Sequence, residues 1–506
     1  MNIASLLRST ARMYPDRGFR YGETRITYAE VEAQAASLGS ALRRRGLQRG
    51  DRVALFARNC PEFVVAMFGA LRAGLIIVPI NAKLVAGELE VILRDSGARA
   101  LIATDDKAAV VDSLGTAVPE TVIWIGGRRE GSFESLLGEG DTTAAVVDVD
   151  PGDTAWLFYT SGTTGQPKGA GLSHRALMAM TLAELANLCD FTADDTVLHV
   201  APLSHGSGLY LLGVVARGSE QVIFNGTSYD PDAVLAQIER DRITVIAFLA
   251  PTMITMLLDA PRSADTSSLR CVIYGGGPIH VATSKRMLER FGPVFAQIYG
   301  MGESPMTITY LPRTAHDLAD PESLASAGYC QLGVEVQVMD ENDRPLPPGV
   351  EGMVCVRGDV VMSGYWNNPA ASAGTLRGGW LHTGDIGRFD ARGRLFLLDR
   401  SNDTIISGGA NIYPREVEEV LMRHPGVCEA VVFGVPDELW GESVAAAVVA
   451  APGEPPAKED LVDFCRSRLA SFKKPKQIVF VDELPKNAYG KVLRRVVRDK
   501  VIALVP

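Results

Sequence analysis

The chain has 506 residues, of which 47% are hydrophobic and 22% are charged, and its formal net charge is −10. This length exceeds what one hydrophobic core supports, while the apolar fraction is that of a globular protein, so we expect two or three folding units. The acidic balance argues against general binding of nucleic acid, which requires a basic face.

Seven cysteines are scattered along the sequence, without a CxxC pair and in odd number. This pattern indicates reduced thiols in a cytoplasmic protein. The first residues predict an amphipathic helix and not a signal peptide, because they lack a long apolar run. The longest apolar stretch, 63–80, contains Arg72 and Pro79, which favours a buried helix and a strand over an integral membrane segment.

Helical and strand-like patterns alternate over the first hundred residues. We expect helices over 26–45, 61–73 and 87–95, and strands over 52–56, 76–80 and 100–103. Such alternation is typical of α/β proteins with parallel-rich sheets covered by helices. The region 115–150 is poorly patterned and rich in Gly, Thr and acidic residues, and we expect loops there.

The alternation resumes between residues 159 and 300, where short apolar strands end in loops of small residues. The expected strands cover 197–201, 244–249, 271–274 and 294–299. Ligands of α/β folds gather at the carboxyl ends of strands. We therefore expect these loops to share one crevice.

The character of the sequence changes near residues 399–403, after which it predicts a small α/β unit. Helices are expected over 414–422 and 458–470, strands over 427–434 and 444–449, and a loop over 451–457. We therefore expect a large N-terminal domain over 1–399, a hinge over 400–403 and a small mobile C-terminal domain over 404–506.

The most informative segment is YTSGTTGQPKG at 159–169, which directly follows the apolar run 155–158. Glycines let backbone N–H groups converge, hydroxyls add donors, and Lys168 supplies a mobile positive charge, so the segment predicts a cradle for a polyphosphate. It is not a Walker loop, because Gly169 follows Lys168 where that loop has Ser or Thr. The alternative is a flexible surface turn, which the position after a strand disfavours.

This segment closely resembles the phosphate loop of the adenylate-forming superfamily, which contains acyl-CoA synthetases, luciferases and the adenylation domains of peptide synthetases. Further motifs of that superfamily follow in the expected order over essentially the whole chain. The resemblance implies that the loop grips the β- and γ-phosphates of ATP, and that Thr164 also takes part in catalysis and in Mg2+ binding. The residues concerned are Thr160, Ser161, Gly162, Thr163, Thr164 and Lys168.

The segment YGMGE at 299–303 resembles the superfamily's YGxTE motif. The resemblance implies that Tyr299 lies against adenine and that Glu303 holds Mg2+ and contributes to catalysis, which suits the preference of Mg2+ for hard oxygens. Gly302 replaces the usual Thr, and we expect this to widen the acyl pocket. The nucleotide site implied here also includes Gly275, Gly276, Gly277, Gly300, Met301 and Gly302.

Two later segments resemble the ribose-binding and domain-junction motifs. WLHTGDIG at 380–387 implies that Asp385 accepts hydrogen bonds from the ribose hydroxyls. In the junction segment, Arg400 is expected to contact ribose and phosphate, and Asn402 is expected to act as the hinge, where relatives usually have Asp or Lys. Gly408 and Gly409 would line the tunnel for the pantetheine arm of coenzyme A.

The segment LPKNAYGK at 484–491 resembles the superfamily's mobile catalytic-lysine segment. The resemblance implies that Lys491 bridges the carboxylate and the α-phosphate during adenylation. Trp440, Phe472 and Lys473, together with Lys83, resemble residues that contact CoA. Aromatic stacking and lysine–phosphate pairing suit the adenine and 3′-phosphate of CoA, whereas the alternative is an ordinary solvated surface.

His205, within PLSHG at 202–206, occupies the position that borders the carboxylate in CoA ligases. It is either a catalytic gate or carboxylate contact, or a structural histidine. The expected pocket is mostly apolar and lacks Arg and Lys, which favours a bulky apolar monocarboxylic acid that is aromatic, fatty or polycyclic. Its residues are His205, Phe248, Leu249, Gly276, Ile298, Met301 and Met306.

These motifs predict an ATP-dependent, AMP-forming acid–CoA ligase with ATP, Mg2+ and CoA as cofactors, a small-molecule acid as substrate and a possible homodimeric state. One alternative is an acyl-adenylating enzyme that loads a carrier protein, but an amino-acid substrate is disfavoured because 204–208 contains no acidic residue. A luciferase-like oxygenase shares the motifs. A non-catalytic nucleotide sensor is disfavoured because Glu303, Arg400 and Lys491 are all present.

Overall fold

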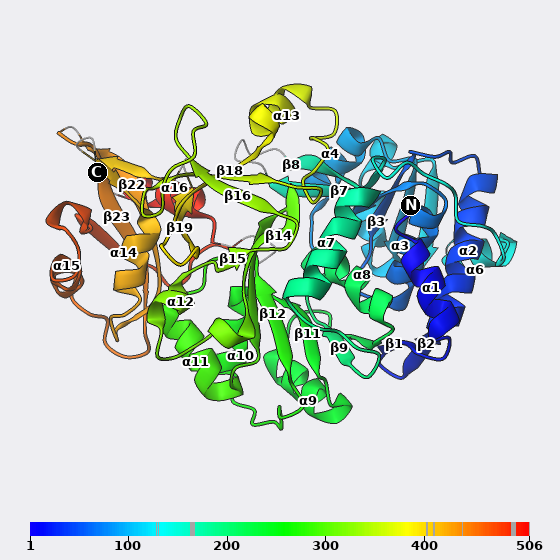
Figure 1. Cartoon of the computed structure of the whole chain (residues 1–506), viewed down its shortest axis with the longest axis horizontal. Coiled ribbons are helices and arrows are strands. Elements are labelled where there is room, and N and C mark those ends of the chain that lie inside the picture. The colour runs from blue at the N-terminus through cyan, green and yellow to red at the C-terminus, as the bar shows by residue number, and fades with distance from the viewer. Residues whose placement is uncertain are drawn as a thin grey trace.

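The structure is a computed structural model of the chain. It describes residues 1–127, 129, 131–161, 167–400, 403–407, 410–437, 439–486 and 492–504. Figure 1 shows an elongated molecule with the small C-terminal domain, orange to red, at one end and the blue N-terminal elements at the other. The mixed α/β architecture with parallel-rich sheets and a small C-terminal domain is the one expected from the sequence.

One large sheet has six strands and carries the start of the phosphate segment. In spatial order the strands are β6 (Thr121–Ile125), β5 (Ala100–Thr104), β3 (Arg52–Phe56), β4 (Ile76–Pro79), β7 (Thr154–Ser161) and β8 (Pro167–Ser173). All pairs are parallel except the β7–β8 hairpin, in which Thr160 lies opposite Lys168. The expected helices are α2 (Tyr28–Arg44), α3 (Pro61–Arg72) and α4 (Ala86–Ser96).

The expectation of loops over 115–150 is wrong in part, because this region contains β6 and α6 (Phe133–Glu139). Strand β6 adds to the edge of the sheet beside β5. Helix α6 is short, but the Ser132 hydroxyl caps it by accepting from the backbone N–H of Ser135, and Phe133 is buried. A cap and three apolar residues in a seven-residue helix are a weak periodic signal.

A second large sheet has nine strands, and the segments 202–206, 275–277 and 299–303 lie at the carboxyl ends of its strands. In spatial order the strands are β15 (Tyr329–Cys330), β14 (Ser304–Leu311), β13 (Phe295–Met301), β12 (Cys271–Gly275), β11 (Val245–Leu249), β9 (Thr196–His199), β10 (Glu220–Ile223), β1 (Gly18–Tyr21) and β2 (Thr24–Thr27). Strands β13 through β1 run parallel, whereas β14, β15 and β2 are antiparallel additions at the two sides.

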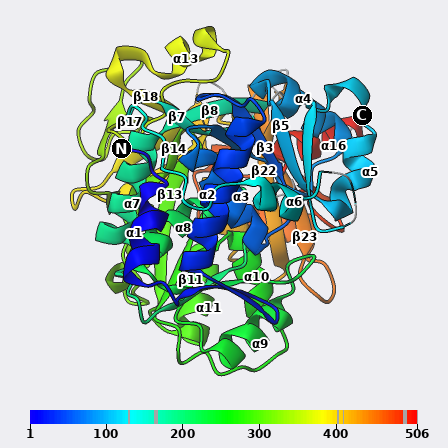
Figure 2. The ribbon, with the colours of Figure 1, turned by 90° about the vertical axis from the view of Figure 1, so that its right-hand side faces the viewer.

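Helices separate the two large sheets. The amphipathic α1 (Ser5–Met13), expected from the sequence, packs with α2 and α8, and Figure 2 shows α1 and α2 toward the viewer. One hydrophobic cluster joins α2, α3 and α8 (Gly206–Arg217) to strands of both sheets. The buried α3 explains the long apolar stretch, and the described residues contain no helix long and apolar enough to cross a membrane.

A four-stranded antiparallel sheet, not anticipated from the sequence, connects the large sheets to the C-terminal domain. It is formed by β16 (Glu335–Met339), β17 (Gly352–Arg357), β18 (Leu381–Phe389) and β19 (Leu395–Arg400). Its importance lies in register, because β18 and β19 place Asp385 directly opposite Arg400.

The C-terminal domain contains its own sheet and helices. Its elements are β20 (Ile405–Ser407), β21 (Ala410–Ile412), α14 (Pro414–Leu421), β22 (Val427–Asp437), β23 (Gly441–Ala450), α15 (Lys458–Arg466), β24 (Gln477–Phe480) and α16 (Arg494–Leu504). Helix α15 ends four residues earlier than expected, where a turn bonds Leu469 back to Cys465. Arg494 of α16 pairs with Asp399 at 3.0 Å, and His280 at the start of α11 (Val281–Phe291) contacts Glu419 of α14 at 2.9 Å.

Candidate active site

The strand that leads into the phosphate segment packs tightly against the YGMGE segment. A Cβ placed on Gly302 would lie 2.5 Å from Cγ2 of Thr160 and 2.7 Å from the ring of Phe158. Contacts that short do not occur, so glycine is required for this close approach. The expectation that Gly302 widens the acyl pocket is therefore wrong, because the side chains of β7 fill the space.

A glutamate and a lysine from two motifs meet at one tyrosine. Glu303 is only 5% exposed, and its Oε1 accepts a 2.7 Å hydrogen bond from the hydroxyl of Tyr365. The Nζ of Lys168 lies 5.3 Å from the centre of the same ring. Burial, followed by the neighbouring Glu303, raises the pKa of Tyr365, so its hydroxyl remains a donor. The arrangement brings a hard oxygen ligand and a cation to the same tyrosine.

A second chain of contacts joins three motifs. The hydroxyl of Tyr299, at the end of β13, donates to Oδ2 of Asp385 at 2.6 Å, and Oδ1 of Asp385 pairs with Nε of Arg400 at 3.0 Å. The charge of Asp385 raises the pKa of Arg400, which stays a cation. Burial, and then Asp385, raise the pKa of Tyr299. The nine-stranded and four-stranded sheets thus present a phenol, a carboxylate and a guanidinium as one unit.

His205 precedes α8 and packs edge-on against Phe158, with 5.0 Å between the ring centroids. Its Nδ1 lies 3.3 Å from the hydroxyl of Ser204. Burial lowers the pKa of His205 to about 3, although a hydrogen bond with the backbone of Ser204 acts in the opposite direction. The imidazole is therefore neutral near pH 7, and it suits a single hydrogen bond to a carboxylate better than an ion pair.

Most of the expected acyl-pocket residues lie together. A Cβ on Gly206 would lie 2.5 Å from Cε of Met306, and one on Gly276 would lie 3.3 Å from Phe248. Phe248 and Ile298 belong to one hydrophobic cluster, against which Met306 packs. Leu249 points to the other face of β11 and packs in a different cluster, so the structure does not bring it to the pocket.

The residues expected to contact CoA come from both domains. Trp440 and Phe472 are exposed by 47% and 52%, which suits aromatic contact with a soluble ligand. The Nζ of Lys473 is paired with Glu416 at 2.6 Å, and Lys83 is exposed in the large domain after β4. Lys473 must therefore leave or share its carboxylate in order to bind a phosphate.

Several expected site residues lie outside the described residues: Gly162, Thr163, Thr164, Asn402, Gly408, Gly409 and Lys491, together with the side chain of Ser161. Their roles stay predictions. Sequence reasoning missed Phe158 and Tyr365 as site residues. Tyr365 belongs to the GYWNNP segment at 364–369, whose backbone bonds to Gly169 and Gly171 beside the phosphate segment, and only this pairing identifies it.

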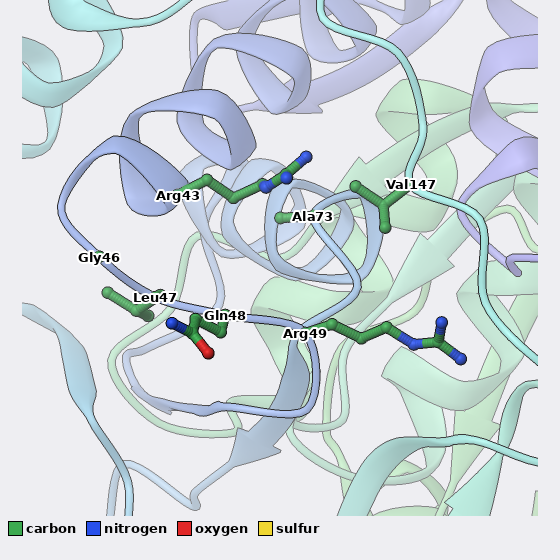
Figure 3. A pocket seen from close by; sticks show the side chains of 7 residues that line it. All are labelled: Arg43, Gly46, Leu47, Gln48, Arg49, Ala73 and Val147. Carbon is green, nitrogen blue, oxygen red and sulfur yellow. The ribbon is translucent and has the colours of Figure 1, made fainter.

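One surface cavity lies away from all of these residues. It measures about 280 Å3, and Figure 3 shows its lining residues: Arg43, Gly46, Leu47, Gln48, Arg49, Ala73 and Val147. It lies beyond the end of α2, and none of the motif residues lines it. It is therefore not part of the candidate active site.

Comparison with known proteins agrees with the motif geometry. The model of AMP-binding enzymes matches residues 7–366, and that of the AMP-binding enzyme C-terminal domain matches residues 416–491. The chain is 38% identical over 495 residues to the feruloyl-CoA synthase of Amycolatopsis sp., covering 97% of each protein. It is also 38% identical over 480 residues to the fatty acid–[acyl-carrier-protein] ligase ScoC of Streptomyces coeruleorubidus, covering 94% of this chain and 91% of that one.

The fold has a solved counterpart in the anthranilate CoA ligase AuaEII in complex with anthranoyl-AMP. The TM-score is 0.91 at 28% identity, and the match covers 100% of this chain and 98% of that one. The chain therefore belongs to the AMP-binding enzyme family. Within it, the chain is an AMP-forming acyl-CoA synthetase, which is an acid–thiol ligase.

Proposed function

We propose that the protein activates a bulky apolar monocarboxylic acid with ATP and transfers the acyl group to CoA, releasing pyrophosphate and AMP. The observation that carries this proposal is the Tyr299–Asp385–Arg400 chain, which joins the adenine, ribose and hinge motifs through contacts of 2.6 and 3.0 Å. An exposed turn or a solvated charge run would not assemble these three groups across two sheets.

In the first half-reaction, a carboxylate oxygen of the acid attacks the α-phosphorus of ATP and pyrophosphate leaves. Catalysis of such a step is mostly positioning and neutralisation of charge. Lys168 would contact the leaving phosphates, Asp385 would accept from the ribose hydroxyls, and neutral His205 would donate to the carboxylate. Lys491 would bridge the carboxylate and the α-phosphate.

Glu303 fits a Mg2+ site, because its buried carboxylate supplies the hard oxygen that this ion prefers, and Thr164 would be its companion. When bound, Mg2+ neutralises phosphate charge. Tyr365 orients the carboxylate through its 2.7 Å hydrogen bond, so the position of Oε1 does not depend on the ion alone.

In the second half-reaction, the thiol of CoA attacks the acyl carbon and AMP leaves. We propose that the small domain turns about residues 400–403 between the two steps, which withdraws Lys491 and brings Gly408 and Gly409 to the tunnel. The exposed Trp440 and Phe472 would then contact CoA.

The apolar cluster of Phe248, Ile298 and Met306 supports an aromatic, fatty or polycyclic acid. Relatives of this chain include feruloyl-CoA, indoleacetate and fatty-acid ligases, and all of these acids fit that description. The second candidate acceptor is a carrier protein, which the 38% identity to ScoC favours.

The test is pyrophosphate release from a panel of carboxylic acids with ATP and Mg2+, with and without CoA, followed by mass spectrometry of the products. A CoA thioester from one apolar acid class is the expected result. Acyl-AMP that persists after CoA is added would favour the carrier-protein alternative. Absence of pyrophosphate release with every acid would overturn the proposed substrate class.

A further inference from the structure

Two polar side chains are buried between helices beside the acyl pocket. Glu184 of α7 (His174–Asn187) and Tyr210 of α8 are each 1% exposed. Among the described residues, no hydrogen-bond partner is found for either carboxyl oxygen of Glu184 or for the hydroxyl of Tyr210. Unpaired buried polar atoms are costly, so such a pair calls for a bound partner.

The two side chains adjoin the pocket at a distance from the carboxylate contact. The ring of Tyr210 lies 6.2 Å from that of Phe248, in the cluster that also contains Ile298. Gly213, one turn beyond Tyr210, leaves room for the carboxyl group, because a Cβ there would lie 2.4 Å from Oε2 of Glu184.

The axis of α8 sets the spacing along the pocket. At 1.5 Å per helical residue, Tyr210 is about 8 Å and Gly213 is about 12 Å along the axis from His205. If His205 contacts the carboxylate of the acid, Glu184 and Tyr210 lie near the opposite end of a substrate of the length of an aryl-propenoic acid.

The chemistry of the pair suits a neutral partner. Burial raises the pKa of Glu184 well above its usual range, so the side chain is a carboxylic acid that both donates and accepts. Burial also raises the pKa of Tyr210, and nearby Glu184 raises it further. Two groups that each donate and accept complement a hydroxyl, whereas an ammonium group would favour an ionised carboxylate.

We propose that Glu184 and Tyr210 bind a hydroxyl group at the far end of the acid substrate, so that the enzyme selects hydroxylated apolar acids. This inference rests on the proposed function of the same site. The hydroxyl belongs either to a phenol of an aryl acid or to the end of an aliphatic chain, and the two sources share the same hydrogen-bonding chemistry.

Matched acids that differ by one hydroxyl test the proposal. The pairs are 4-hydroxycinnamate with cinnamate, and 10-hydroxydecanoate with decanoate, and the measured quantity is kcat/KM for pyrophosphate release. The acid without the hydroxyl leaves the polar groups of Glu184 and Tyr210 without a hydrogen-bond partner. We therefore expect the hydroxylated acid to be preferred by about tenfold to a hundredfold in kcat/KM within at least one pair. The pair that shows it identifies the source of the hydroxyl.

Variants assign the preference to these residues. In E184L, which has similar volume and no polar atom, the ratio within the pair is expected to fall to about one, and Y210F is expected to lower it in part. E184Q keeps polar atoms at this position, so it can be measured instead if E184L does not fold. Y229F removes a phenol hydroxyl that bonds Met253 in the neighbouring cluster, and it should leave the ratio as in the wild type.

A binding measurement gives a second readout. Calorimetric titration of wild type and E184L with the sulfamoyl-adenosine analogues of the two cinnamates should show the same ratio in Kd without turnover. Equal kcat/KM within both pairs in an active wild type, or an unchanged ratio in E184L, would overturn the inference and leave the ligase proposal standing. A wild type that turns over none of the four acids while adenylating other acids would also overturn it, whereas inactivity with all acids would contradict the proposed function itself.

Discussion

The hydroxyl of Tyr299 donates a 2.6 Å hydrogen bond to Oδ2 of Asp385, which links β13 of the nine-stranded sheet to β18 of the four-stranded sheet. Asp385 uses its other oxygen for Arg400, so neither residue is held by its own strand alone. Three motifs, which lie between residues 299 and 400, thus fix one another at the proposed nucleotide site.

Removing this hydroxyl should weaken nucleotide binding. In Y299F, the charged Asp385 loses the hydrogen bond that it accepts from Tyr299, and a hydrogen bond to a charged group is worth about 1.5–3 kcal/mol. We expect KM for ATP to rise by about tenfold or more, while KM for the acid changes little. Initial rates at varied ATP and fixed acid measure this. An effect confined to KM for the acid would contradict the assignment of Tyr299 to the nucleotide.

Gly302 should tolerate no side chain. In G302A, the new Cβ would meet Thr160 and Phe158, and we expect a loss of about 1–3 kcal/mol in unfolding free energy together with lower activity. T160S removes the nearest methyl group and should restore part of the stability in the double variant. Urea denaturation measures both. G374A is the control, because a Cβ there meets nothing within 4 Å, and a helical site favours alanine.

Buried histidines should make the fold sensitive to mild acid. Burial lowers the pKa of His174, His199 and His316 to about 4, below the unfolded value near 6.5. The unfolded chain therefore binds protons first, so stability is complete above pH 6.5 and falls as the pH drops toward 4. Each histidine contributes a slope of about 1.4 kcal/mol per pH unit.

The measurement is Tm from pH 7.5 to 4.5. The slope should be shallower in H316Q than in the wild type, and unchanged in H424Q, since the half-exposed His424 lies elsewhere in the C-terminal domain. Equal slopes in all three proteins would show that carboxylates alone govern the acid response.

Arg494 should be central to the C-terminal domain. It pairs with Asp399, Asp403 and Glu418 at 2.9–3.0 Å and is mostly buried, and removing one member of such a network leaves unpaired charges. R494Q is expected to lose about 3 kcal/mol of unfolding free energy. R495Q is the matched control, because Arg495 is 75% exposed in its side chain and lies 3.9 Å from Asp499, and it should change stability by less than about 0.5 kcal/mol.

The two half-reactions should separate at Lys491. K491A is expected to abolish adenylate formation but to leave thioester formation from preformed acyl-AMP largely intact, because the lysine acts only while the carboxylate attacks. K486A, in the same segment, removes a lysine that pairs with Glu429 at 2.8 Å and should spare both steps. Equal loss of both half-reactions in K491A would contradict the proposed domain rotation.

Many of the parallel strands were predictable because they are apolar runs that end in glycine, proline or another small residue, but the parallel strands β1, β6 and β10 were not expected. Strand β3 spans the expected residues, and β11 begins one residue later than expected. The antiparallel sheet of β16–β19 could not be predicted from the sequence, because partly exposed strands have weaker apolar patterns and their pairing is set by register. Two contacts at the site also could not be predicted, because their partners are dozens of residues apart in the sequence. Tyr365 lies beside Glu303, and Glu184 lies beside Gly213. No local sequence pattern indicates either pair.

Strand β19 ends at Arg400, which is held opposite Asp385 by backbone register and by its side chain. The first residue of the proposed hinge over 400–403 is therefore also the last residue of β19, and it is paired with the aspartate of the proposed ribose site. The start of the proposed hinge is thus anchored to the proposed nucleotide site. In the proposed rotation, Arg400 would keep its place beside Asp385 while the C-terminal elements beyond it move.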